Sequence, residues 1–151
     1  MADFVEEVVV NSSKDDTYAF LSNPMNRTKI YSIVSEVESL SSGTSPVEEI
    51  AVGSRFLEMR QFANRRVGTE LELTELVPPY RVTIKSEANG MNVFYTYQLG
   101  DSDEGTMIRF EGKVEATKLK TRLMRPALVK MVRQEDSDHL LYVKKALEGD
   151  S

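Results

Sequence analysis

Apolar and polar residues alternate along most of the chain, which predicts a protein built mainly of β-strands. Residues 3–11 are rich in valine and predict the first strand. From residue 54 to residue 116, apolar residues again recur at every second position between turn-forming stretches. A period of two gives each strand one apolar face, so we expect an antiparallel meander that buries one side of a sheet.

Two short helices are predicted after the first strand. Ser13, with Asp16 three residues later, resembles a capping box, which opens a helix that reaches about Ser22. Pro24 lies at the start of a second short helix over residues 25–32.

The longest apolar stripe with helical spacing lies near the C-terminus. It predicts one helix from about 118 to 148, which Pro126 starts or kinks. The stretch 41–53, SSGTSPVEEIAVG, has the Gly, Ser and Pro content of a loop. One face of the sheet must be covered, and only the C-terminal helix carries a stripe long enough to cover it.

The hairpin registers follow from placing apolar residues opposite each other on one face. Asn89-Gly90 favours a two-residue type I′ turn, and the pairs that it sets are Val82 with Tyr97, Ile84 with Tyr95 and Ser86 with Val93. Across the next turn, the expected pairs are Tyr97 with Ile108, Tyr95 with Phe110 and Val93 with Gly112.

The hairpin around Ala63 and Asn64 allows two registers. A three-residue loop pairs Met59 with Leu71 and Leu57 with Leu73. A two-residue loop would instead bury Glu58 and Arg60. We expect the three-residue loop, because burying charged side chains is costly.

Composition narrows the possible functions. The 151 residues are 40% hydrophobic, so we expect one domain, residues 1–151, with a sizeable core. The chain has no cysteine, which excludes disulfides and cysteine-ligated metals. A net charge of −5 argues against general nucleic-acid binding. The acidic N-terminus and the lack of an apolar run of about 18 residues predict a cytoplasmic protein without stable membrane insertion.

Positive charge is concentrated before and inside the predicted C-terminal helix. Residues 113–133 contain one acidic residue, Glu115, and seven basic residues: Lys113, Lys118, Lys120, Arg122, Arg125, Lys130 and Arg133. One interpretation is a solvated helix face. The other is a positive rim that attracts an anionic ligand or makes transient contact with an acidic membrane surface.

Polar residues interrupt the apolar stripe in the stretch QEDSDHLL, residues 134–141. Glu135, Asp136 and His139, the chain's single histidine, fall on or beside this stripe. Burying a leucine stabilises a fold by about 1.5–3 kcal/mol, whereas burying an unpaired polar group costs about 1–3 kcal/mol. We therefore expect a cavity holding water or ligand here. The alternatives are that a kink at Pro126 turns these residues to solvent, or that Glu135 and His139 satisfy each other.

The order of five segments resembles the helix-grip (SRPBCC) superfamily of START-type, birch-pollen-allergen-like and polyketide cyclase/dehydrase proteins. The segments are SSKDDTYAFLSNP, VGSRF, ELELTELVPPYRVTIKS, YTYQLGDSDEGTMIRF and LLYVKKALEG, and they span nearly the whole chain. The resemblance implies an α+β fold in which a seven-stranded antiparallel sheet wraps around a long C-terminal helix, with two short helices between strands 1 and 2. Tyr31 stands where many relatives have tryptophan, and Asn64 where they often have a turn glycine.

The resemblance also implies a cavity between sheet and helix that holds a hydrophobic small molecule. The first hypothesis is therefore binding, transport or sensing of a ligand of lipid, isoprenoid or polyketide type by a monomer or homodimer, without cofactor or metal. The expected ligand-binding residues are Leu57, Met59, Leu71, Leu73, Ile84, Val93, Tyr95, Tyr97, Ile108, Phe110, Leu128, Met131, Val132, Glu135 and His139.

Two other hypotheses stay open. In a cofactor-free polyketide cyclase or dehydratase, His139 would act as general acid or base, oriented by Glu135, while Tyr95 or Tyr97 stabilises an enolate. In a protein-interaction module, the basic segment 118–133 would contact the partner.

Overall fold

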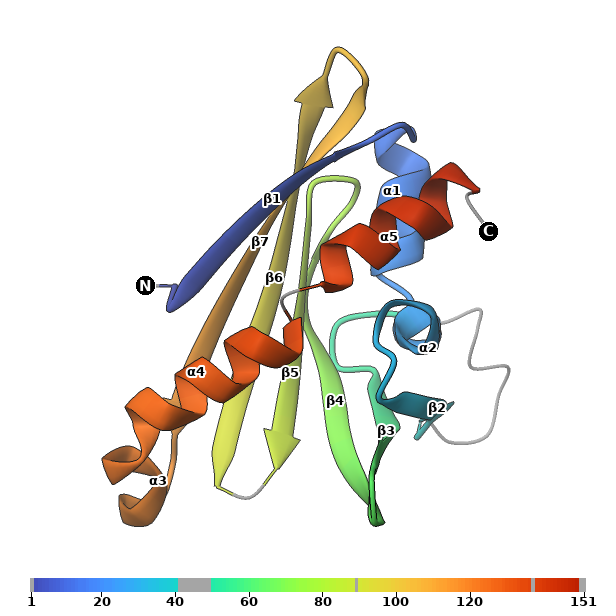
Figure 1. Cartoon of the computed structure of the whole chain (residues 1–151). Helices are drawn as coiled ribbons and strands as arrows, with labels where there is room; N and C mark the ends of the chain where they lie inside the picture. Colours follow the sequence, from blue (N-terminus) through green and yellow to red (C-terminus); the bar gives the residue numbers. More distant parts are fainter. Residues whose placement is uncertain (1, 41–49, 89, 137, 150–151) are drawn as a thin grey trace.

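The computed structural model describes residues 2–40, 50–88, 90–136 and 138–149, with every side chain in these ranges except those of residues 62, 88, 135 and 136 (Figure 1). The described residues form seven strands: β1 (Phe4–Val10), β2 (Val34–Ser39), β3 (Arg55–Phe62), β4 (Arg65–Val77), β5 (Arg81–Ala88), β6 (Met91–Ser102) and β7 (Gly105–Ala116). All neighbours are antiparallel, in the order β1-β7-β6-β5-β4-β3-β2. The predicted fold class is confirmed. Most of the predicted loop 41–53 lies outside the described residues.

The helices lie on one face of this sheet (Figure 1). Between β1 and β2 come α1 (Lys14–Leu21), the 3₁₀ turn η1 (Pro24–Asn26) and α2 (Arg27–Ile30). The Ser13 hydroxyl accepts a hydrogen bond from the backbone N–H of Asp16, which is the predicted N-cap. The second predicted helix is divided into η1 and α2.

The C-terminal helical region is long, as predicted, but it is not one continuous helix. It consists of α3 (Leu119–Leu123), α4 (Arg125–Asp136) and α5 (His139–Glu148), and Pro126 lies in the first turn of α4. The two longer helices pack on different elements, since α4 contacts β7 whereas α5 contacts β1, α1 and α2. None of the described helices is long and apolar enough to span a membrane.

The β5–β6 register is the predicted one. Val82 pairs with Tyr97, Ile84 with Tyr95 and Ser86 with Val93. Gly90 has φ +77°, as a type I′ turn requires.

The predicted β6–β7 register is wrong by two residues. Tyr97 pairs with Phe110, Tyr95 with Gly112 and Val93 with Val114. The turn is fixed by Gly105, whose φ is +139° and where a Cβ would lie 2.3 Å from the carbonyl oxygen of Val10. A shift by two residues keeps every side chain on its predicted face, so the set of residues on the inner face is the predicted one.

The predicted β3–β4 loop is also wrong. Only Ala63 and Asn64 separate the strands, and Phe56 pairs with Leu71 while Glu58 pairs with Thr69. The odd shift reverses the faces of β3, so Leu57 and Met59 lie on the face opposite Leu71. Glu58 is buried on the inner face.

Gly112 on β7 leaves room for the ring of Phe4 on the neighbouring strand β1. A Cβ at this position would lie 2.1 Å from the ring of Phe4, its partner across the ladder. That ring is buried and packs on Phe110, with centroids 6.0 Å apart.

We expect Gly112→Ala to lower the free energy of unfolding by about 1–3 kcal/mol, because the new methyl group would force the buried Phe4 ring out of its packing on Phe110. Gly100→Ala in β6 is the matched control, since a Cβ there has no neighbour within 4 Å. Urea denaturation measures both. Equal stabilities of the two variants would contradict this packing.

Candidate functional site

Most of the predicted ligand-binding residues line the inner face of the sheet. Eight of these side chains are buried, each with at most 3% of its surface exposed: Leu71, Leu73, Ile84, Val93, Tyr95, Tyr97, Ile108 and Phe110. From the helices, Val132 and His139 are buried and Leu128 is half-buried. Met131 is exposed, and Leu57 and Met59 lie on the other face of the sheet. The side chains of Glu135 and Asp136 lie outside the described residues.

A buried ion pair connects the sheet to α2. The Glu58 side chain on β3 has no exposed surface, and its Oε2 accepts a hydrogen bond from Nε of Arg27, the first residue of α2. Its Oε1 accepts a second bond from Nε of Arg60, at 2.8 Å. Two guanidinium groups therefore surround one carboxylate, which leaves one excess positive charge inside the protein.

The three groups determine each other's ionisation. Burial acts to raise the pKa of Glu58, but Arg27 and Arg60 outweigh it, and the pKa lies below the usual 4.5. Burial acts to lower the pKa of Arg27, and Glu58 with the neighbouring tyrosines raises it well above its usual value. All three groups are charged at neutral pH.

Arg27 also contacts two aromatic rings. Its guanidinium carbon lies 4.7 Å from the ring centroid of Tyr31 and 5.2 Å from that of Tyr95, which are cation–π distances. Neither terminal nitrogen of this buried guanidinium bonds to a residue in the described ranges. The cation is thus held by Glu58 on one side and by aromatic rings on the other.

His139, the first residue of α5, continues this arrangement. Its ring is 1% exposed and stacks on Tyr31, with centroids 5.2 Å apart and planes 5° apart. Phe110 and Tyr97 make T-shaped contacts with it, at centroid distances of 4.3 and 5.8 Å. A polar cluster, defined here as Arg27, Tyr31, Glu58, Arg60, Tyr95, Tyr97 and His139, therefore runs from β3 to α5.

One end of the polar cluster borders an open pocket of about 250 Å³, here called the His139 pocket. It lies between the end of α2 and the start of α5, and it is lined by Ile30, Tyr31, Ser32, Ile33, Gln134, Asp138, His139 and Tyr142. The lining combines apolar side chains with an imidazole, hydroxyls, an amide and a carboxylate. Such a surface suits an amphipathic small molecule.

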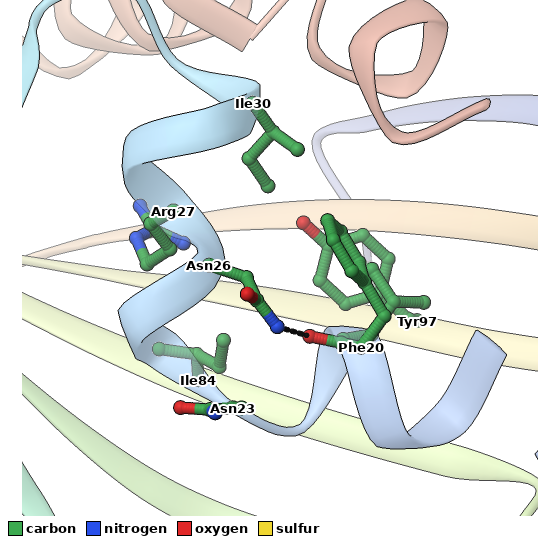
Figure 2. A pocket seen from close by; sticks show the side chains of 8 residues that line it. Phe20, Asn23, Asn26, Arg27, Ile30, Ile84 and Tyr97 are labelled. Carbon is green, nitrogen blue, oxygen red and sulfur yellow. Dashed lines mark hydrogen bonds between the residues drawn. The ribbon is translucent and has the colours of Figure 1, made fainter. Parts of the chain in front are cut away.

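A second, much smaller pocket lies beneath α2 (Figure 2). Phe20, Asn23, Asn26, Arg27, Ile30, Ile84 and Tyr97 line it, and the amide nitrogen of Asn26 donates to the carbonyl oxygen of Phe20 at 2.9 Å. Its volume of about 10 Å³ is room for one water molecule. It is too small for a ligand. Two other pockets, one of about 380 Å³ on the outer face of the sheet and one of about 190 Å³ beside Val37 and Phe56, touch no residue of the polar cluster. Among these pockets the His139 pocket is therefore the candidate site.

Sequence reasoning missed Arg27 and Glu58. The disfavoured two-residue loop between β3 and β4 was the signal that pointed to a buried Glu58. What made that register acceptable is Arg27, which lies 31 residues away in the sequence.

Comparison with known proteins assigns the chain to a family. The profile of the family described as "Polyketide cyclase / dehydrase and lipid transport" matches residues 1–148. The chain belongs to this family. A search of curated proteins finds no match.

Solved structures of low sequence identity share the fold of this polyketide cyclase/dehydrase family member. The di-domain ARO/CYC StfQ from the steffimycin biosynthetic pathway is 13% identical with a TM-score of 0.72, over 97% of this chain and 50% of StfQ. This chain therefore spans about half of StfQ. TTHA0849 from Thermus thermophilus is 14% identical with a TM-score of 0.71, over 97% of both chains. The Aha1 dimer from Colwellia psychrerythraea is 20% identical with a TM-score of 0.58, over the full length of both.

We expect Glu58→Gln to lower the free energy of unfolding at pH 7 by about 3–5 kcal/mol, because it leaves two guanidinium groups without a buried counter-charge. Glu70→Gln is the matched control, since Glu70 pairs with Arg55 where both side chains are largely exposed, and we expect a loss below about 1 kcal/mol. Chemical denaturation measures both.

The same variant tests the sign of the pH dependence. Because the folded-state pKa of Glu58 is lowered, its contribution is complete above the usual 4.5 and is lost as the pH falls through the folded-state value. The stability of the unmodified protein should therefore decline more steeply below pH 4.5 than that of Glu58→Gln. Parallel curves would show that Glu58 is not paired as described.

Proposed function

We propose that the protein binds a small amphipathic molecule at the His139 pocket, with its polar end against Tyr31 and His139. The observation that carries this proposal is the buried Tyr31–His139 stack, which forms a wall of a pocket of about 250 Å³. Membership of a family named for polyketide cyclisation and lipid transport supports it.

The charge of the polar cluster favours one ligand class among lipids, isoprenoids and polyketides. Arg27, Glu58 and Arg60 together carry one excess positive charge, and Arg27 lies over the ring of Tyr31 at the pocket wall. The pocket lining itself carries one carboxylate, Asp138, so the positive charge lies behind the Tyr31 wall. There it favours a ligand whose carbonyl or phenol oxygens point toward Tyr31 and His139. We therefore favour an aromatic polyketide type over a plain hydrocarbon chain.

A blocking substitution tests this assignment. Ser32 is exposed at the pocket lining, so Ser32→Trp fills the pocket without disturbing the core. We expect it to weaken the binding of emodin, a planar polyketide probe, at least about tenfold, as measured by isothermal titration calorimetry. Ala63→Trp in the exposed β3–β4 turn is the control and should bind like the unmodified protein. Equal affinities of both variants would contradict binding in this pocket.

A second candidate function is catalysis of cyclisation or dehydration, with His139 as general acid or base. It is favoured by the burial of His139 beside Tyr31 and Tyr97, and by the fold shared with StfQ, which is described as an ARO/CYC. The orienting role of Glu135 stays a prediction, since its side chain lies outside the described residues.

We expect His139→Gln to lower turnover of a poly-β-ketone thioester mimic by about 10²–10⁴-fold, while emodin affinity changes only several-fold. Tyr80→Phe alters an exposed tyrosine and should leave turnover unchanged. Product formation followed by liquid chromatography gives the rates. Unchanged turnover in His139→Gln would end the catalytic assignment, and binding of emodin would then stand alone.

A further inference from the structure

The segment from Lys118 to Met124, here called the α3 tip, lies at one end of the molecule (Figure 1). Its apolar side chains are exposed. Leu119 is 74% exposed, Leu123 78% and Met124 47%, and no side chain of α3 is buried. Three neighbouring, strongly exposed apolar side chains form a patch, and such patches mark interaction sites.

Cations neighbour these apolar residues in the sequence. Lys118, Lys120 and Arg122 belong to the α3 tip, and Lys130 follows on α4. None of the four forms an ion pair within the described part of the chain. They belong to the run of seven cations against one acid from 113 to 133, in a chain of net charge −5. Positive charge and exposed apolar surface therefore coincide.

The α3 tip and its two flanks are anchored to the β5–β6 turn, to β7 and to the residue before β1. The carbonyl oxygen of Gly90, in the β5–β6 turn, accepts hydrogen bonds from the Thr117 N–H at 2.8 Å, the Thr117 hydroxyl at 2.7 Å and the Thr121 hydroxyl at 3.1 Å. Arg125 donates to Asp3 at 2.6 Å and to the carbonyl oxygen of Val114 at 3.2 Å. The exposure of Leu119 and Leu123 is thus part of the folded structure.

We propose that the α3 tip docks on the surface of an anionic lipid bilayer, with Leu119, Leu123 and Met124 entering the headgroup region. Apolar side chains accompanied by lysine and arginine fit an interface that is apolar below and negative above. The proposal does not depend on a ligand in the His139 pocket.

Two other partner classes fit the α3 tip less well. Nucleic acid is bound through cations together with polar or aromatic contacts, and three exposed aliphatic side chains supply neither. A stable protein interface buries about 800 Å² and 20–30 residues on each partner. The α3 tip is a short projecting helix with short flanks, so it is smaller than such an interface.

Vesicle co-sedimentation tests the docking. We expect the protein to bind vesicles of phosphatidylcholine with about 30% phosphatidylserine, and to bind pure phosphatidylcholine vesicles far more weakly. Each cation near the surface contributes about fivefold, so Lys120→Gln/Arg122→Gln/Lys130→Gln should weaken binding about a hundredfold. Leu119→Ser/Leu123→Ser should also abolish most of the binding, because the apolar contact is lost.

A matched control separates the α3 tip from net charge. Lys29→Gln/Arg65→Gln/Arg66→Gln removes three exposed cations elsewhere and should bind nearly as well as the unmodified protein. Thermal denaturation checks that all variants fold. Equal losses in both triple variants, binding without phosphatidylserine dependence, or retention on double-stranded DNA but not on vesicles would each overturn the proposal.

Discussion

The bond from Arg27 to Glu58 is the interaction on which the rest of the site depends. The helix that carries Arg27 is only four residues long, too short to be stable without tertiary contacts. Its first residue is bonded to β3, and its C-terminal neighbour Tyr31 is thereby placed over the ring of His139. The bond therefore acts on position more than on net stability, since a buried ion pair gains little over well-packed apolar side chains but is costly to break. The position of Tyr31, in turn, shapes the wall of the His139 pocket.

Local signals were sufficient for much of the fold. Asn89-Gly90 sets the β5–β6 register because its turn type follows from two adjacent residues, and Ser13 caps α1 within one turn. The β6–β7 register was missed because Gly105 is required by a distant contact, the close approach of the Val10 carbonyl. The predicted faces of β3 were wrong for a similar reason. The prediction avoided burying Glu58, because local sequence does not reveal that Arg27 on another element neutralises it.

Of the predicted ligand-binding residues whose side chains the structure describes, His139 alone lines the His139 pocket, whereas the predicted inner-face residues of β4 to β7 are buried in the core. Both sets follow from periodicity, because alternation marks the inner face and a polar residue in an apolar stripe indicates a special environment. Periodicity does not show that α5 starts at His139, nor that Tyr31, which directly follows α2, stacks on it. The basic segment 118–133 was recognised from composition, whereas the exposure of Leu119 and Leu123 within it needed the tertiary structure.

The most direct test of the account uses the fact that the chain has one histidine. Its imidazole carbon-bound protons give one assignable set of signals in a proton–carbon correlation spectrum of labelled protein. The account predicts that added emodin shifts these signals progressively to saturation, because the ligand lies in the pocket that Tyr31 and His139 line. If calorimetry shows emodin bound while the His139 signals stay where they were, the ligand lies elsewhere and the account is wrong.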